Sequence, residues 1–274
     1  GTMLEKALIP LNLHEATQLV TDMCRFLANF GTQTVLLLHV GSNRGRTGAR
    51  RRARLKQYAE TLEKTGFETD ISLRPGSVQI EIIKAAQEVD ADFISMPFKK
   101  KNWISRAILG SNVKDVIRQS EIPVFVYKEP RRIQQADEIF RLLYAVSLKG
   151  KENLVAQYIQ DRSFNVDEVI VLHVGKRAPD PVVEREREEK VEEELQTLLK
   201  ECGVTQEEGE YISVIGNPRN QIVRIARRLN ADIVLLGKAD SESGMGPVLG
   251  STAEEVSYNA PCSVLIIPKE ETAL

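Results

Sequence analysis

The segment Val35-Leu36-Leu37-Leu38-His39-Val40 decides the fold, because it occurs a second time as Val169-Ile170-Val171-Leu172-His173-Val174. Further matches follow in the same order along the chain, and Gly110-Ser111 returns as Gly250-Ser251. The offset between matched positions changes only from 134 to 140 residues. A repeat of this kind predicts two copies of one structural unit, so that a site in one copy should be sought at the equivalent place in the other.

Each copy alternates short apolar runs with amphipathic stretches, which indicates strands alternating with helices. Five strands and four helices in this order predict an α/β fold with right-handed crossovers. The chain should therefore form two tandem doubly wound domains, each with a five-stranded parallel sheet in the order 3-2-1-4-5. We place domain 1 at residues 3–128, a linker at 129–138 and domain 2 at 139–270. In the first copy we expect strands at 6–11, 34–40, 67–73, 92–96 and 123–127, and helices at 15–29, 50–64, 77–89 and 111–120.

The composition excludes several classes of protein. No apolar run approaches the roughly 20 residues that a membrane-spanning helix needs. The net charge of −2 hides an asymmetry, since residues 1–128 hold 19 Lys or Arg against 13 Asp or Glu and the remainder is acidic. Six arginines lie between Arg44 and Arg54 without interleaved aromatic residues, so we interpret this run as a solvated surface and expect no nucleic-acid partner. The three widely spaced cysteines indicate small buried residues in a reducing cytoplasm.

The loop after the fourth strand of the second copy is rich in glycine. It includes Gly237 and ends at Gly250-Ser251-Thr252, where we expect a helix to begin. Glycines allow backbone N–H groups to approach a phosphate, and a helix N-terminus favours an anion. In doubly wound sheets ligands bind at the carboxyl ends of the strands where the strand order reverses, which here means beside the first and fourth strands.

With these residues the chain resembles a tandem universal stress protein over nearly its whole length. The resemblance implies an adenine-nucleotide alpha-hydrolase-like fold. It also implies a nucleotide site with Gly-x-x-Gly, nine residues and Gly-Ser/Thr after the fourth strand, and an Asp at the end of the first strand. In the second copy it assigns Gly237, Asp240, Gly250, Ser251 and Thr252 to the loop after the fourth strand, Ser147 to the position of the Asp, and Val174 to the adenine side. In the first copy it assigns Gly110, Ser111 and Asn112 to the same loop, Asn12 to the position of the Asp, and Val40 to the adenine side.

The chain departs from this pattern in both copies. Asp240 replaces a glycine and would place a carboxylate near any phosphate, which is repulsive. Pro97 and Lys100 replace both early glycines of the first copy, and proline has no N–H to offer. We therefore expect AMP, ATP or another anion to bind weakly, AMP to be penalised less than ATP, and the second copy to be the better site.

The resemblance implies a stress-response regulatory protein that acts by binding and is not an enzyme. One alternative is a weak ATP hydrolase or nucleotide-transfer enzyme on the same fold, since function depends on the site and not on the fold alone. Another is a protein-interaction module that binds no nucleotide. We expect no catalytic residue and no metal site, because His39 and His173 end buried strands and no metal-ligand spacing surrounds them.

The last strands of the two sheets suggest how the copies meet. Exposed strand edges are usually paired or covered. We expect strands 123–127 and 262–267 to pair antiparallel, which would make an intramolecular pseudo-dimer of the two domains, and we keep a homodimer as a further arrangement. We expect a small-molecule nucleotide as the other partner, no membrane contact and a cytoplasmic location.

Overall fold

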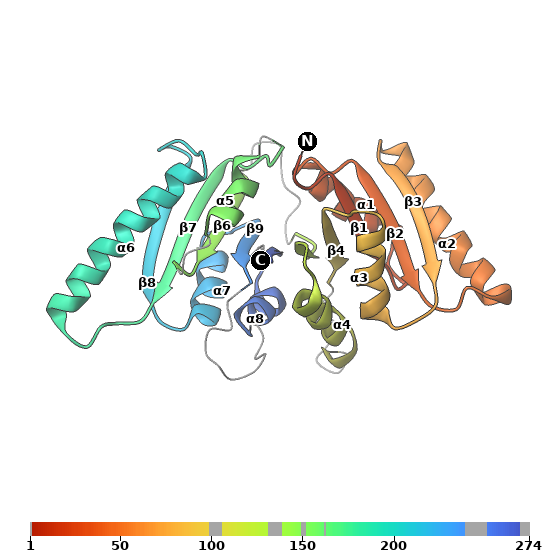
Figure 1. The fold of residues 1–274 in the computed structure, drawn as a ribbon. Coiled ribbons are helices and arrows are strands. Elements are labelled where there is room, and N and C mark those ends of the chain that lie inside the picture. Colours follow the sequence, from red (N-terminus) through yellow and green to blue (C-terminus); the bar gives the residue numbers. More distant parts are fainter. Residues whose placement is uncertain are drawn as a thin grey trace. The chain divides into compact units, whose positions relative to one another are not determined.

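The computed structural model of the chain describes residues 2–98, 106–130, 139–148, 152–161, 163–238 and 251–268. The chain divides into two compact units, unit 1 from Gly1 to Glu129 and unit 2 from Pro130 to Leu274. Each unit is a parallel sheet with helices packed against it (Figure 1). The two-domain α/β fold class predicted from the repeat is therefore confirmed.

Nine elements make up unit 1, in strict alternation of strand and helix. The strands are β1 (Lys6–Pro10), β2 (Thr34–Val40), β3 (Glu68–Arg74), β4 (Phe93–Pro97) and β5 (Val124–Tyr127). The helices are α1 (Thr17–Ala28), α2 (Gly45–Lys64), α3 (Val78–Glu88) and α4 (Arg106–Gln119).

Unit 2 repeats this order. Its strands are β6 (Arg141–Val146), β7 (Glu168–Gly175), β8 (Gly209–Ile215), β9 (Ile233–Gly237) and β10 (Ser263–Ile267). Its helices are α5 (Glu152–Gln160), α6 (Pro181–Glu201), α7 (Pro218–Arg228) and α8 (Ser251–Asn259).

The strand order within unit 1 is β3-β2-β1-β4-β5, and within unit 2 it is β8-β7-β6-β9-β10. All strand pairs within each unit are parallel. Both orders correspond to the predicted 3-2-1-4-5. In unit 1 the strands β2 and β3 are added on one side of β1, and β4 and β5 on the other, so the strand order reverses between β1 and β4. In unit 2 it reverses between β6 and β9.

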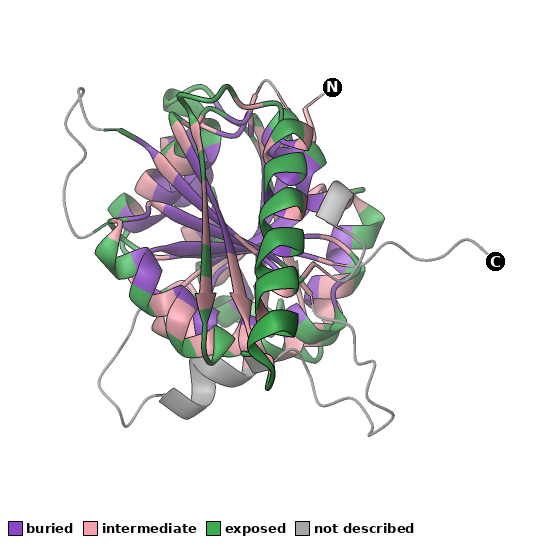
Figure 2. Ribbon diagram, turned by 90° about the vertical axis from the view of Figure 1, so that its left-hand side faces the viewer, coloured by how far each residue is buried: buried purple, intermediate pink, exposed green. Residues whose placement is uncertain are grey.

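Helices cover both faces of each sheet, which explains the continuous apolar runs of the central strands. In unit 1, α1 packs beside α2 and α3 packs beside α4; in unit 2, α5 packs beside α6 and α7 beside α8. Residues Val169–Leu172 of β7 are all buried as a result. Each fully buried Leu or Val contributes about 1.5–3 kcal/mol through burial of its side chain. Buried residues accordingly concentrate in the strands, and exposed residues lie on the outer sides of the helices (Figure 2).

Equivalent local interactions occur in both units. The Asp92 carboxylate accepts a hydrogen bond of 2.8 Å from the backbone N–H of Lys6, and the Asp232 carboxylate accepts one of 2.7 Å from that of Arg141. Each aspartate thus joins the start of the fourth strand to the start of the first. These contacts give the aspartate the same structural role in both copies of the repeat.

Two helices begin earlier than the sequence pattern predicted. We expected the second helix from Arg50, but α2 begins at Gly45. Its first turns are exposed apart from Gly48, so they need no apolar spacing, and arginine is a good helix former. We expected the fourth helix from Ser111, but α4 begins at Arg106. Gly110 and Ser111 consequently lie inside α4 and not at its N-terminus. A helix tolerates a glycine at such a position, since it costs only about 1 kcal/mol.

Candidate functional site

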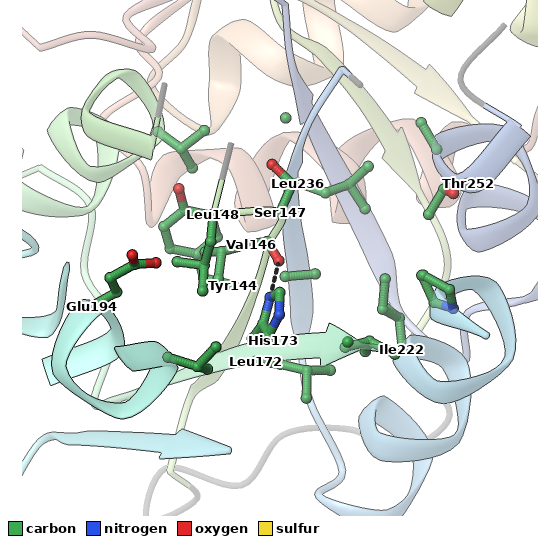
Figure 3. A pocket seen from close by; sticks show the side chains of 18 of the residues that line it. Tyr144, Val146, Ser147, Leu148, Leu172, His173, Glu194, Ile222, Leu236 and Thr252 are labelled. Carbon is green, nitrogen blue, oxygen red and sulfur yellow. Dashed lines mark hydrogen bonds between the residues drawn. The ribbon is translucent and has the colours of Figure 1, made fainter. Parts of the chain in front are cut away.

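A cavity of about 730 Å³ lies in unit 2 at the carboxyl ends of β6, β7, β9 and β10. It includes the point where the strand order reverses, between β6 and β9. Apolar side chains form much of its wall, among them Leu172, Ile222 and Leu236 (Figure 3). Its size is within the range of roughly 300–1,000 Å³ that is typical of small-molecule sites.

Four of the predicted site residues line this cavity, although they come from four different elements. Ser147 follows β6, Val174 is near the end of β7, Gly237 ends β9, and Thr252 is in the first turn of α8. Ser147 is exposed and Thr252 is half-buried. The fold thus brings together residues that are up to 105 positions apart in sequence.

The remaining predicted residues of the second copy are Ser251, Asp240 and Gly250. The backbone of Ser251 begins α8, as expected. Asp240 and Gly250 lie outside the described residues. The described part of the site therefore consists of the β6 loop, the end of β7, the end of β9 and the N-terminal turn of α8.

The loop after the first strand has an unusual backbone conformation in both units. Leu148 has a φ of 56° and the equivalent Leu13 has a φ of 72°, both in the left-handed region. This conformation costs an ordinary residue about 1–2 kcal/mol, and it persists only where the surrounding structure fixes it. Leu148 lines the cavity, so the constrained turn helps to shape the site beside Ser147.

Both histidines that end the second strands are held by backbone groups. The Nδ1–H of His39 donates to the carbonyl oxygen of Leu11 at 2.8 Å, and the Nδ1–H of His173 donates to that of Val146 at 3.3 Å (Figure 3). Each ring therefore ties the end of the second strand to the end of the first. This agrees with the structural interpretation of the histidines, although His173 also lines the cavity.

Arg187 of α6 is a cavity residue that the sequence analysis missed. Its guanidinium lies against Gly175, where a Cβ atom would come within 2.8 Å of Nη1. The same arrangement occurs in unit 1, where a Cβ atom on Gly41 would come within 2.8 Å of Nη1 of Arg51. A glycine directly after His-Val, followed 10 to 12 residues later by an arginine in both copies, is the sequence signal that could have identified this contact.

Glu184 holds the guanidinium of Arg187 in a fixed orientation. Nε and Nη2 of Arg187 donate to the two carboxylate oxygens at 3.1 and 2.6 Å, and the backbone N–H of Ala178 donates to the same carboxylate at 2.6 Å. These hydrogen bonds, first those of Arg187 and then that of Ala178, lower the pKa of Glu184 to about 2. Glu184 is therefore ionised over the whole neutral and mildly acidic range.

The loop after the first strand of unit 1, where Asn12 takes the position of Ser147, differs from its counterpart in unit 2. The Asn12 side-chain oxygen accepts a hydrogen bond of 2.8 Å from the backbone N–H of His14, so it is already engaged within its own loop. That loop is also fastened to α2, because Arg54 and Tyr58 both donate to the carbonyl oxygen of Glu15. Of the other predicted residues, Val40 ends β2, Gly110 and Ser111 lie within α4, Asn112 is half-buried in α4, and Lys100 lies outside the described residues.

Two further observations limit the chemistry of the described residues. All three cysteines are buried and none forms a disulfide, and burial raises the pKa of Cys24 and of Cys202 to about 12, which keeps both thiols protonated. Among the described side chains no group of three or more His, Cys, Asp or Glu residues could hold a metal ion. Within the same ranges, no helix combines the length and the hydropathy that a membrane crossing needs.

Comparison with known proteins identifies the family. The model of the universal stress protein family matches residues 3–128 and again residues 139–268. The stress response protein NhaX of Bacillus subtilis is 28% identical over 112 residues, which are 41% of this chain and 64% of NhaX. A universal stress protein of Methanocaldococcus jannaschii is 37% identical over 78 residues, which are 28% of this chain and 46% of that protein. The matched stretches thus span less than two thirds of either relative.

The fold is also found among solved structures. A universal stress protein from Archaeoglobus fulgidus superimposes with a TM-score of 0.69 at 20% identity, covering 98% of this chain and 97% of that one. The predicted resemblance is confirmed by these matches. The chain belongs to the universal stress protein family, whose model it matches twice.

Proposed function

We propose that this universal stress protein binds a purine nucleotide in the cavity of unit 2, takes AMP more readily than ATP, and acts in the stress response by binding rather than by turnover. The observation that carries the proposal is the cavity itself. It is about 730 Å³ in volume, much of its wall is apolar, and its lining includes the polar side chains of Arg187 from α6 and Thr252 from α8. A flat purine fits apolar walls, while its phosphate needs donors at one end.

The N-terminus of α8 is the proposed phosphate end. The first N–H groups of a helix have no partner within the helix, and together with the helix dipole they favour an anion there; the hydroxyl of Thr252 is in the same turn. Gly237 ends β9 on the same side of the strand-order reversal and presents no side chain to the cavity. The base would then lie toward Val174 at the end of β7, on the other side of β6.

Charge supports a monophosphate over a triphosphate. The loop between β9 and α8 contains Asp240, which would repel additional phosphates. Ser147 stands where a carboxylate would hold a ribose hydroxyl, and its neutral hydroxyl forms a weaker hydrogen bond by about 1–2 kcal/mol. We therefore expect ATP to bind no tighter than roughly high-micromolar concentrations.

We propose that unit 1 contributes to the pseudo-dimer of the two domains and does not bind the nucleotide. Its Asn12 oxygen is engaged by His14, and Gly110 is within α4, which supports loss of the nucleotide site there. We keep the pseudo-dimer of domains 3–128 and 139–270, the linker 129–138 and a cytoplasmic location as parts of this proposal. Three buried cysteines that form no disulfide support a reducing compartment.

Titration calorimetry with AMP and with ATP, read beside phosphate release in excess Mg²⁺-ATP, tests the proposal. We expect AMP to bind, ATP to bind more weakly, and no phosphate to be released above background. Multiple turnovers of ATP would instead favour the weak hydrolase. Absence of binding by both nucleotides would favour the interaction module.

A further inference from the structure

Arg187 presents fixed hydrogen-bond donors to the base end of the cavity. Its side chain is 23% exposed and that of Glu184 is 14% exposed, so this ion pair is largely shielded from water. A guanidinium has five N–H donors and no acceptor. Glu184 takes one from Nε and one from Nη2, which leaves the edge formed by Nη1 and the second Nη2 proton.

The two units use this edge differently. In unit 1, Nη1 of Arg51 donates to the carbonyl oxygen of Ser42 at 3.1 Å. In unit 2, none of the described residues accepts a hydrogen bond from Nη1 of Arg187, which lies over Gly175 on the cavity wall. Gly48 occupies in unit 1 the place that Glu184 has in unit 2, three residues before the arginine, so Arg51 lacks the equivalent carboxylate clamp.

The charge of α6 decides which part of a nucleotide this edge meets. The helix contains eight Glu against four Lys or Arg, and the two cations that it contributes to the cavity wall, Arg187 and Lys190, are each paired with a glutamate, so α6 offers no net positive charge to a phosphate. Lys190, which also lines the cavity, is paired with Glu194 at 3.9 Å and is 77% exposed, so it adds little attraction. A neutral purine base suits this end, and the phosphate belongs at the N-terminus of α8.

We infer that the unit 2 site selects purine nucleotides with a carbonyl oxygen at C6 over those with an amino group there, and that Arg187 reads this difference. The inference rests on the proposed function of the same cavity. A 6-oxopurine offers two adjacent acceptors, O6 and N7, which match the two N–H donors of an arginine edge. Adenine offers N7 together with an amino group, and this donor would face the donors of Arg187. Because Glu184 fixes the guanidinium, the arginine cannot readily turn away.

IMP and AMP are the probes for this test, because the C6 substituent and the N1 proton that accompanies it are their only differences. Calorimetry on the full chain should give at least about tenfold tighter binding of IMP than of AMP. In Arg187→Gln the ratio should fall to about one. The matched variant Arg51→Gln, at the equivalent position of unit 1, should retain the preference of the unchanged chain.

A second variant keeps the inference testable if Arg187→Gln fails to fold. Gly175→Ala places a methyl group within 2.8 Å of Nη1, which is too close for the guanidinium to keep its position, so the preference for IMP should fall severalfold. The corresponding Gly41→Ala in unit 1 is its control, because a Cβ atom there approaches Arg51 equally closely.

The outcomes separate this inference from the proposed function. If AMP binds as tightly as IMP or more tightly, the inferred selectivity is wrong, but the proposal that unit 2 binds a nucleotide still holds. Loss of both nucleotides in Arg187→Gln, with no preference in the unchanged chain, would mean that Arg187 binds the phosphate, which also overturns it. Absence of binding by both nucleotides to the unchanged chain would contradict the proposed function together with the inference.

Discussion

Gly237→Val should close the nucleotide site without unfolding unit 2. Gly237 ends β9 and lines the cavity, and among the residues that the structure describes a Cβ atom there would meet a single neighbour, Cγ2 of Val155, at 3.9 Å. That distance is an ordinary van der Waals contact, and valine favours strands. The substitution should therefore change the free energy of unfolding by no more than about 0.5 kcal/mol.

The effect on the ligand should be larger. The added methyl groups occupy space that a bound nucleotide needs, at the junction of the phosphate and base ends. Inserting methyl groups into a packed site costs about 1–3 kcal/mol, which corresponds to a loss of affinity of roughly 5- to 150-fold. The equivalent residue of unit 1 is Pro97, so Pro97→Val is the matched control and should leave the affinity unchanged.

Calorimetry with AMP, combined with thermal melting of both variants, measures the two effects separately. Unchanged AMP affinity in Gly237→Val, or an equal loss in Pro97→Val, would refute the placement of the site. A large drop in melting temperature would refute the argument that this position is open.

Three further expectations follow from the site and the sheet edges. The double variant Asp240→Gly with Ser147→Asp should tighten ATP binding at least about tenfold by removing a repulsive carboxylate and adding a charged acceptor for ribose, as calorimetry can show, and no gain would mean that other contacts limit affinity. Because the pKa of Glu184 is lowered to about 2 from its ordinary value of 4.5, its carboxylate stabilises the folded state above pH 4.5, and this contribution is lost as the pH falls toward 2. The melting temperatures of the unchanged chain and of Glu184→Gln should therefore differ by a constant amount from pH 8 to 5 and converge below pH 4.5, whereas a difference that already declines between pH 7 and 5 would contradict the lowered pKa. If β5 and β10 pair, hydrogen exchange at their amides should be as slow as in the central strands, and fast exchange in either would exclude the pairing.

Burial explains why the strands could be predicted from the sequence. A central strand covered on both faces, such as β7, must be apolar throughout, and its limits follow from where that run ends. The start of α2 was misplaced because an exposed helical turn needs no apolar residue, so the arginines from Arg44 onward carried no periodic signal. The start of α4 was misplaced because Gly110 resembled the beginning of a helix.

The candidate site could be predicted only in part. The resemblance assigned Ser147, Val174, Gly237 and Thr252 to one site, and the fold places all four around one cavity. Arg187 was missed because its role depends on Gly175 and Glu184 lying beside it in three dimensions. Within α6 nothing distinguishes it from its many charged neighbours, and only its spacing from the glycine after His-Val, compared between the two copies, could have identified it. The engagement of Asn12 by His14 likewise depends on the local turn of the loop and not on residue type.

A crystal structure of the full chain grown with saturating AMP tests nucleotide binding in unit 2 most directly. We expect density for the purine beside Val174 and Gly175, with the phosphate at the N-terminal turn of α8 near Thr252. Density for AMP at Asn12 and Val40 in unit 1, or a unit 2 cavity without nucleotide at saturating AMP, would contradict it.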